Sequence, residues 1–596
     1  MVNESPSAFL NVDQSFTGRR WLARPGNERT ALALAQGYGL PELVGRVLAA
    51  RGITVDGAAT YLAPTLRALM PDPSHLRDMD VAADRIARAI MAGEKVAVFG
   101  DYDVDGATSS ALLRRFFRAA GADLAVYIPD RIVEGYGPNA PALLRLHGEG
   151  AKLVVTVDCG VTAFDPLAAA ADAGLDVVVI DHHAAEPRLP QALAVVNPNR
   201  LDDASPHKTL AAVGVTFLLV VAINRALRKA GWYGEARPEP DLLGWLDLVA
   251  LGTVCDVVPL TGLNRALVAQ GLKVMARRSN PGITALADQC RLAERPDAWH
   301  AGFVLGPRVN AGGRVGASDL GARLLSTDDP GEAAAIARLL EGHNAERRAI
   351  EAAVLDEALA NVEAAAEDMP GLVFAVGEGW HPGVIGIVAA RLKERYNRAA
   401  CVVALADGVG KASGRSVRGI DLGAAVIAAR QSGLLIAGGG HRMAAGFTVT
   451  ADRMDELKQF LASRIAEQQA GPLVPTLELD GALSVGGATT GLVEMLNRLA
   501  PFGTGNAEPR FALTDARIVR ADVVGEKHVR CILTGPGGER LKAIAFRALD
   551  TDLGIALLKS GGAPLHIAGY LRPDRWNGAD GVQLLIEDAA RVWREA

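Results

Sequence analysis

Cysteine is scarce in this chain. Five cysteines occur among 596 residues, and no two of them form a CxxC pair. Their number and wide spacing argue against a disulfide framework and against a structural zinc site. A reducing compartment, the cytoplasm, is therefore the expected location. The five residues are Cys159, Cys255, Cys290, Cys401 and Cys531.

Positive charge in excess and long apolar runs are also lacking. The 62 Lys and Arg residues are outnumbered by 68 Asp and Glu residues, which gives a formal net charge of −6. Because there is no blanket positive field, any polyanion must be bound locally. No stretch approaches the roughly 18 uncharged apolar residues of a membrane span, and the N-terminus lacks the basic start and apolar run of an export signal. We expect neither membrane insertion nor export.

Two nucleotide-binding motifs are absent as well. No GxGxxG follows the first predicted strand, and no GxxxxGK[ST] loop occurs, which argues against an NAD- or ATP-binding α/β enzyme. The chain does have an ordinary globular composition, with 49% hydrophobic and 22% charged residues, which excludes wholesale disorder. At about 150 residues per domain, the length predicts several domains.

Strands alternate with helices in the first third of the sequence. Predicted strands at 95–100, 152–157 and 176–180 are rich in Val and Ile, and helical patterns occur between them, for example at 164–174. This alternation predicts a parallel sheet covered by helices. The near-continuous apolar runs predict strands that are buried on both faces.

The rest of the chain divides by pattern. Residues 210–290 are helical in pattern, and the Ala- and Glu-rich stretch 330–368 predicts a long helix, with a break expected at Gly342. Strand patterns return at 372, and after 472 short strand-like runs are separated by Gly, Pro and Asn. The predicted units are a helical segment at 1–75, an α/β domain at 76–328, a connecting helix at 329–368, a second α/β domain at 369–470 and a β-barrel at 471–596.

Three carboxylates follow the first predicted strand in the segment GDYDVDGAT. Asp101, Asp103 and Asp105 alternate along the chain, so in an extended segment they point to one side. Such close like charges repel one another unless cations lie between them, and oxygen ligands favour Mg²⁺ or Mn²⁺. The alternative is an acidic surface turn that caps a helix beginning near Thr108.

The next two strands also end in possible metal ligands. Asp158 closes one strand, and Asp181-His182-His183 closes the other. Because sites gather beyond the carboxyl ends of parallel strands, these groups can converge. His182 tilts the preference towards Mn²⁺ without excluding Mg²⁺. Asp256 lies in an apolar segment, where a buried carboxylate needs a partner or a metal; a helix-capping Asp is the alternative.

Basic and glycine-rich segments suit phosphate binding. The segment Gly306-Pro-Arg-Val-Asn-Ala-Gly-Gly-Arg314 carries two guanidinium groups beside glycines that permit a close approach of a ligand. The segments 411–416 and 438–446 offer amides, hydroxyls and charges. For the first segment the alternative is a surface loop. For the other two it is ordinary glycine turns.

Taken together, GDYDVDGAT, VTVDCG, DHH, LGTVCDVVPL and GPRVNAGGR resemble the motifs of the DHH phosphoesterase superfamily and, within it, of the RecJ exonucleases. The resemblance runs from about residue 35 to 596. It implies an α/β fold in which a parallel-sheet DHH domain is joined by a long helix to a second α/β domain, the DHH-associated domain, followed by a C-terminal OB-like β-barrel.

The resemblance also implies site residues. Two divalent ions, Mn²⁺ or Mg²⁺, are expected, with Asp158 bridging them and His183 facing the scissile phosphate; Asp105 counts with these two as catalytic. Many relatives have a histidine where this chain has Phe99, and Asp101 is expected to replace it. Asp181 is expected to orient an imidazole. The implied metal ligands are Asp101, Asp103, Asp105, Asp158, His182 and Asp256; the implied substrate contacts are Arg308, Asn310, Arg314, Ser413, Arg415 and His441.

The terminal barrel resembles an OB fold, in which aromatic side chains and scattered cations hold single strands. Four aromatic residues are candidates for stacking on bases, and each could instead belong to the core. They are Phe502, Phe511, Tyr570 and Trp576.

The expected function is hydrolysis of single-stranded DNA from its 5′ end by a two-metal mechanism, releasing 5′-mononucleotides in DNA repair and recombination. The residues argue for two-metal phosphoester hydrolysis; DNA, single-strandedness and polarity come from the resemblance. It also suggests single-strand-binding protein and a RecQ-type helicase as partners of a monomer. One alternative is a DHH hydrolase of small nucleotides or oligoribonucleotides, which would not need the barrel. Another is a DNA-binding protein without activity, although no acidic ligand has been lost.

Overall fold

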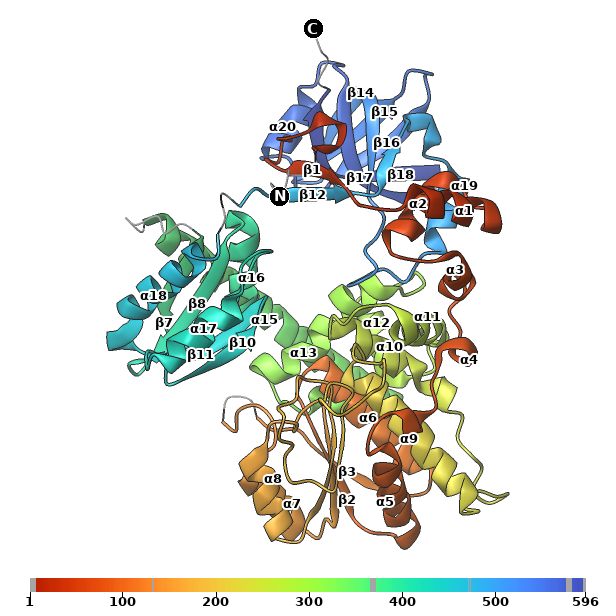
Figure 1. Cartoon of the computed structure of the whole chain (residues 1–596), viewed down its shortest axis with the longest axis vertical. Helices are drawn as coiled ribbons and strands as arrows, with labels where there is room; N and C mark the ends of the chain where they lie inside the picture. The colour runs from red at the N-terminus through yellow and green to blue at the C-terminus, as the bar shows by residue number, and fades with distance from the viewer. Residues whose placement is uncertain are drawn as a thin grey trace.

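The computed structural model describes residues 7–130, 133–364, 371–469, 471, 473–574 and 581–592. Figure 1 shows the first α/β domain at the bottom, the second on the left and the barrel at the top. Among the described residues, no helix is both long and apolar enough to cross a membrane.

A five-stranded parallel sheet forms the first domain, in the order β3-β2-β4-β5-β6. Its strands are β2 (Val96–Gly100), β3 (Leu124–Tyr127), β4 (Leu153–Val157), β5 (Asp176–Ile180) and β6 (Ala194–Val196). All residues of β2 and β4 are buried, because helices cover both faces. Helices α5 (Met79–Ala92), α6 (Val104–Ala119) and α9 (Ala212–Lys229) pack on one face, and α7 (Ala140–Gly148) and α8 (Phe164–Asp172) on the other. The predicted parallel sheet is confirmed.

The acidic segment after β2 differs from its prediction. It is not extended through Asp105, because α6 begins at Val104 rather than near Thr108. Asp103 caps this helix, since its side chain accepts a hydrogen bond of 3.0 Å from the backbone N–H of Gly106. Asp105 therefore lies in the first helical turn.

Helices complete the first domain. They are α10 (Leu246–Cys255), α11 (Gly262–Met275), α12 (Pro281–Gln289), a π-helical turn (His300–Leu305), α13 (Gly306–Val315) and α14 (Leu320–Ser326). The glycine-rich segment expected to suit phosphate binding is thus the helix α13 and not the surface loop given as its alternative. Tertiary packing overrides the weak helix propensity of its glycines.

Helix α15 (Pro330–Ala364) connects the two α/β domains. It passes through Gly342 without interruption, so the expected break is wrong. One glycine costs only about 1 kcal/mol in a helix interior, and α15 packs against α12, α13 and α16. The predicted end of this helix, at 368, lies outside the described residues.

The second α/β domain has a mixed sheet in the order β10-β11-β9-β8-β7. Strands β7 (Leu372–Glu378) and β8 (Ala399–Ala406) are parallel, whereas β9 (Val409–Arg415), β10 (Ala437–His441) and β11 (Ala444–Thr450) pair antiparallel. The helices are α16 (Ile385–Tyr396), α17 (Leu422–Gln431) and α18 (Met454–Ala466). Gly438–Gly440 forms the edge strand rather than a turn.

The C-terminal sheet closes on itself, because β14 pairs with both β15 and β17. Its strands are β13 (Gly481–Leu483), β14 (Phe511–Val524), β15 (His528–Thr534), β16 (Arg540–Ala545), β17 (Leu565–Asp574) and β18 (Gly581–Arg591), with helices α19 (Thr490–Asn497) and α20 (Asp552–Leu558). Phe511 is fully buried in the core of this barrel, so it cannot stack on DNA. Phe502 and Tyr570 are partly buried, beside Arg51 and Arg510. Trp576 lies outside the described residues.

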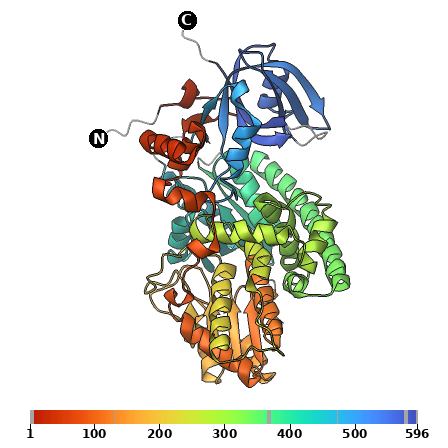
Figure 2. The same cartoon turned by 90° about the vertical axis from the view of Figure 1, so that its right-hand side faces the viewer.

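The N-terminal segment folds onto the barrel. Strand β1 (Arg20–Ala23) pairs in parallel with β12 (Thr476–Leu479). Helices α1 (Glu28–Tyr38), α2 (Glu42–Ala50) and α3 (Val55–Leu62) share the barrel's apolar core, and both views show them beside it (Figure 1, Figure 2). After the short α4 (Leu66–Leu69), the chain enters the first domain.

Candidate metal centre

Carboxylates and imidazoles converge at the carboxyl edge of the first sheet, where parallel-sheet sites form. Three groups of possible metal ligands form there, and within each group the ligand atoms all lie within 4.8 Å of one another. The groups are Asp101, Asp103 and Asp158; Asp105, His182 and Asp256; and Asp158, His182 and His183. The structure thus brings together every metal ligand proposed from the sequence. Asp158 belongs to two of the groups, which is the arrangement that a bridge between two ions requires.

The Nε2 atom of His182 lies close to carboxylate oxygens of both the second and the third group. It is 3.4 Å from Oδ1 of Asp158, 3.6 Å from Oδ2 of Asp256 and 4.0 Å from Oδ2 of Asp105. Three of these atoms, His182 Nε2, Asp158 Oδ1 and Asp256 Oδ2, are buried without any hydrogen-bond partner. Buried polar atoms are normally paired, and these separations suit ligands around one small cation. The residues fit a divalent metal.

Electrostatics supports the same conclusion. Burial, together with the neighbouring carboxylates, raises the pKa of Asp105 and of Asp158 far above the usual range. Burial and the charge of Asp103 raise the pKa of Asp256 to about 7. Burial lowers the pKa of His182 to about 4, so its imidazole is neutral and able to bind a metal. Only added positive charge lets all these carboxylates ionise together.

The backbone fixes the acidic ligands. The carboxylate of Asp105 accepts the backbone N–H groups of Ala212 and Val213, at 2.7 and 2.8 Å, where α9 begins. Gly106 allows α6 to approach the preceding turn, because an added Cβ would lie 2.4 Å from the carbonyl oxygen of Asp101. Asp158 has a left-handed backbone with φ of 61°, a strained conformation of the kind found at functional sites.

The Asp-His-His segment is held by its own aspartate. Asp181 accepts the backbone N–H groups of Val161, His182 and His183, and its Oδ1 lies 2.7 Å from Nδ1 of His183. Burial alone would lower the pKa of His183, but the hydrogen bond to Asp181 outweighs burial and raises this pKa to about 9. Asp181 therefore orients His183 rather than joining a ligand group.

The sequence reasoning missed three supporting residues. The Tyr136 hydroxyl donates to the carbonyl of Asp158 at 3.1 Å, and the Tyr136 ring meets His183 edge-on, with centroids 6.2 Å apart. The side-chain amides of Asn197 and Asn199 donate to the carbonyls of His183 and His182, at 2.9 and 2.5 Å. The position of both asparagines directly after β6, at the same sheet edge, was the available signal.

Helix α13 lies beside the metal motif. Gly313 packs on Tyr102, since an added Cβ would come within 2.8 Å of the Tyr102 side chain. Arg314 reaches the second domain, where its Nη1 donates to the carbonyl of Gly383 at 2.6 Å. Arg308 is instead engaged by Glu341 of α15 and by the carbonyl of Val304.

The second domain supplies the remaining predicted contacts. Arg415 of β9 donates to Ser413 Oγ at 3.2 Å and to the carbonyl of Gly414 at 2.9 Å. Burial lowers the pKa of Arg415, and no carboxylate pairs with it among the described residues. His441 is exposed on the edge strand β10. This half-buried cation beside a hydroxyl suits an anionic group.

The fold and this cluster define a phosphoesterase of the DHH class. The DHH family N-terminal domain matches residues 95–253, the DHHA1 domain matches 368–467, and the RecJ OB domain matches 479–588. The chain belongs to the RecJ family.

Similarity to RecJ proteins extends over nearly the whole chain. The single-stranded-DNA-specific exonuclease RecJ of Dickeya dadantii is 38% identical over 92% of this chain and 96% of its own. The crystal structure of RecJ from Thermus thermophilus in complex with Mn²⁺ superimposes with a TM-score of 0.80 at 31% identity, covering 97% of this chain and 80% of the other. The Mg²⁺ complex of the same protein gives a TM-score of 0.74 at 29% identity over 97% of this chain and 78% of that one.

Proposed function

We propose that this protein is a metal-dependent exonuclease that degrades single-stranded DNA from its 5′ end and releases 5′-mononucleotides. The observation that carries the proposal is the position of Asp158 in two ligand groups, together with two buried atoms of these groups, Asp158 Oδ1 and His182 Nε2, that have no hydrogen-bond partner. The relatives are named single-stranded-DNA-specific exonucleases and share most of the chain, including the barrel.

Two divalent ions, Mn²⁺ or Mg²⁺, would be held by Asp101, Asp103 and Asp158 on one side and by Asp105, His182, Asp256 and the shared Asp158 on the other. When bound, they supply the positive charge that activates a water and neutralises the phosphoryl oxygens. The ring of His183 is half exposed beside this cluster. Asp181 orients the ring of His183 and stabilises its imidazolium, so that His183 would face the scissile phosphate and donate a hydrogen bond to it.

Substrate binding would use both domains. Arg314 and Asn310 of α13 and Ser413, Arg415 and His441 of the second domain would hold the terminal phosphate and the backbone near the metals. Arg308 would contribute after exchanging its pairing with Glu341. Because the binding groups come from two lobes, the substrate lies between them, and a single strand fits where a duplex would be too wide.

In the cell, we infer that the protein acts in the cytoplasm, in DNA repair and recombination. An enzyme that needs single strands depends on a RecQ-type helicase to expose them, and single-strand-binding protein would present the exposed strand. Barrel aromatics Phe502 and Tyr570 are the described candidates for contacts with that strand.

The test uses purified protein, Mn²⁺ and a single-stranded oligonucleotide with an internal and a 3′ label. A descending product series that keeps the 3′ label and disappears with a chelator is expected. Products that lose the 3′ label first would contradict the polarity. Equal cleavage of a blunt duplex would contradict strand specificity. Hydrolysis of small nucleotides without cleavage of DNA would indicate the alternative DHH hydrolase.

A further inference from the structure

Two exposed aromatic rings lie on the segment that leads into α13. The side chains of Trp299 and Phe303 are 51% and 71% exposed, and their rings stack with centroids 6.1 Å apart and planes 30° apart. Such large apolar rings are normally more buried than this. An ordered, exposed pair is a surface suited to another flat ring.

This aromatic pair is anchored next to the metal centre. Trp299 immediately precedes the π-helical turn, and π-helical turns often occur at functional sites. The turn packs on the end of α10, where Cys255 Sγ lies 3.5 Å from the carbonyl oxygen of Ala301. Gly306 is needed for this approach, because an added Cβ would lie 2.4 Å from Cys255 Sγ. Cys255 is followed directly by Asp256, one of the proposed metal ligands. The aromatic pair therefore has a fixed position relative to the metal-ligand cluster.

The pair lies one helix length from the proposed phosphate contacts. Phe303 lies in the π-helical turn that runs directly into α13, and α13 carries Asn310 and Arg314, which are four residues apart and so share one side of that helix. At 1.5 Å per residue, Phe303 lies about 16 Å from Arg314. That length corresponds to a few nucleotides of an extended strand.

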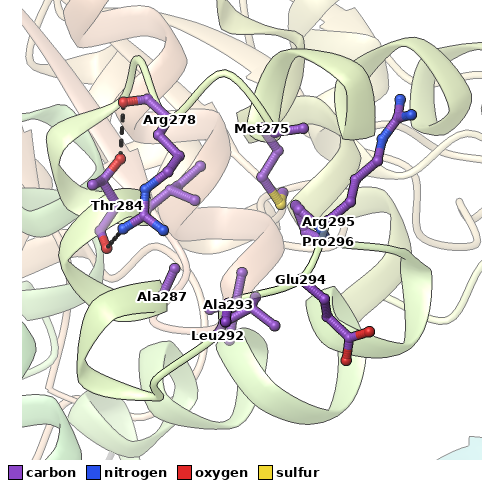
Figure 3. A pocket seen from close by; sticks show the side chains of 12 residues that line it. Met275, Arg278, Thr284, Ala287, Leu292, Ala293, Glu294, Arg295 and Pro296 are labelled. Atoms are coloured by element: carbon purple, nitrogen blue, oxygen red, sulfur yellow. Dashed lines mark hydrogen bonds between the residues drawn. The ribbon is translucent and has the colours of Figure 1, made fainter. Parts of the chain in front are cut away.

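The charged side chains around the aromatic pair are compatible with a bound phosphate backbone, because the carboxylates are paired and one cation has no ion pair within the described part of the chain. The two nearby carboxylates, Glu294 and Asp297, are both engaged by His300, at 3.2 and 2.6 Å. Arg295 forms no ion pair with another described residue. Figure 3 shows its guanidinium pointing away from the adjacent cavity of about 420 Å³, which leaves this cation free to meet a phosphate.

We propose that Trp299 and Phe303 form a stacking platform for bases of the DNA strand, a few nucleotides downstream of the scissile bond. The inference rests on the proposed function and adds the residues that hold the strand in line with the metals. Every base has a π face, so stacking tolerates any sequence. That tolerance is what an enzyme that advances along a strand requires.

The first test compares KM and kcat for a single-stranded oligonucleotide. Trp299→Ala and Phe303→Ala should each raise KM by about 5- to 150-fold, the loss expected for one base–aromatic stack. Phe303→Leu keeps the apolar contact but removes the π face, so it should lose as much as Phe303→Ala, whereas Phe303→Tyr should restore KM. Leu144→Ala, which truncates an exposed apolar side chain of α7, is the matched control and should leave KM unchanged.

The second test identifies the stacked base. A single abasic site is moved along the oligonucleotide, and KM is measured for the wild-type protein and for Phe303→Ala. At the stacked position, the abasic site should raise the wild-type KM but leave that of the variant unchanged, because the lost interaction is the same. A role confined to folding would give no such position.

The outcomes separate this inference from the proposed function. Degradation of the intact strand by the wild-type protein tests the exonuclease itself. If the wild type degrades DNA and both alanine variants keep its KM, the platform does not exist, and the rings belong to another interface. A wild-type KM for Phe303→Leu, or equal effects of abasic sites on both proteins, would also overturn stacking.

Discussion

Oδ1 of Asp181 lies 2.7 Å from Nδ1 of His183 and also accepts the backbone N–H groups of both histidines. One buried carboxylate oxygen thus sets both the ring and the main chain of the Asp-His-His segment. Partners of this kind commonly contribute 10- to 100-fold to activity.

Asp181→Asn should therefore lower kcat by about 10- to 100-fold. A neutral amide does not stabilise the His183 imidazolium as a carboxylate does. The amide also has only one oxygen to accept the hydrogen bonds that the two carboxylate oxygens of Asp181 accept. The measurement is kcat on a single-stranded oligonucleotide at saturating Mn²⁺, with circular dichroism to confirm folding. Asp165→Asn, on the surface helix α8, is the control. A kcat within twofold of the wild type would contradict the orienting role.

Asp158→Asn should abolish measurable cleavage without lowering the stability of the metal-free protein. Asn tolerates the left-handed backbone of this position, and its neutral side chain relieves repulsion among the buried carboxylates. Thermal melts with a chelator and with Mn²⁺ provide the measurement. The rise in Tm on adding Mn²⁺ should be reduced or lost in the variant. An unchanged rise would show that Asp158 does not hold the ions.

Gly313→Ala should lower both stability and activity, although alanine is the better helix former. Its Cβ would meet Tyr102 at 2.8 Å and displace α13 from the motif after β2, at a cost of about 1–3 kcal/mol. Gly342→Ala on α15 is the opposite case, because nothing lies within 4 Å of its Cβ. That variant should gain up to about 1 kcal/mol. Relative to the wild type, Tm should fall for Gly313→Ala and rise for Gly342→Ala. Equal changes in Tm would refute the packing argument.

Asp247→Asn should change how stability depends on pH. Burial raises the pKa of Asp247 in α10 to about 6, so the folded wild type loses stability as pH rises from about 4 to about 6. Asn has no such loss. The stability difference, variant minus wild type, should increase between pH 4 and pH 8 by at most about 3 kcal/mol. Denaturant melts at both pH values measure it, and a constant difference would contradict the buried titration.

Much of the first domain could be predicted because its signals are local. Val-rich strands that end in Asp158 or in Asp181 define both the sheet and the edge where ligands gather. Helix α13 could not be predicted, because its glycines are needed for packing against residues far away in sequence, Gly313 against Tyr102 and Gly306 against Cys255. The pairing of Arg308 with Glu341 depends on how α13 and α15 pack. Phe511 could not be assigned to the core without knowing which face of β14 is inside the barrel.

The pairing of β1 with β12 also has a consequence for synthesis. Residues 20–23 leave the ribosome long before residues 476–479 exist. At about 5–20 residues per second, the interval is roughly 20 to 90 seconds. Until then, the apolar faces of α1 and α2 have no barrel to cover them. The nascent N-terminal segment therefore exposes apolar surface during synthesis, whereas the first α/β domain, contained in one continuous stretch, can fold while translation proceeds.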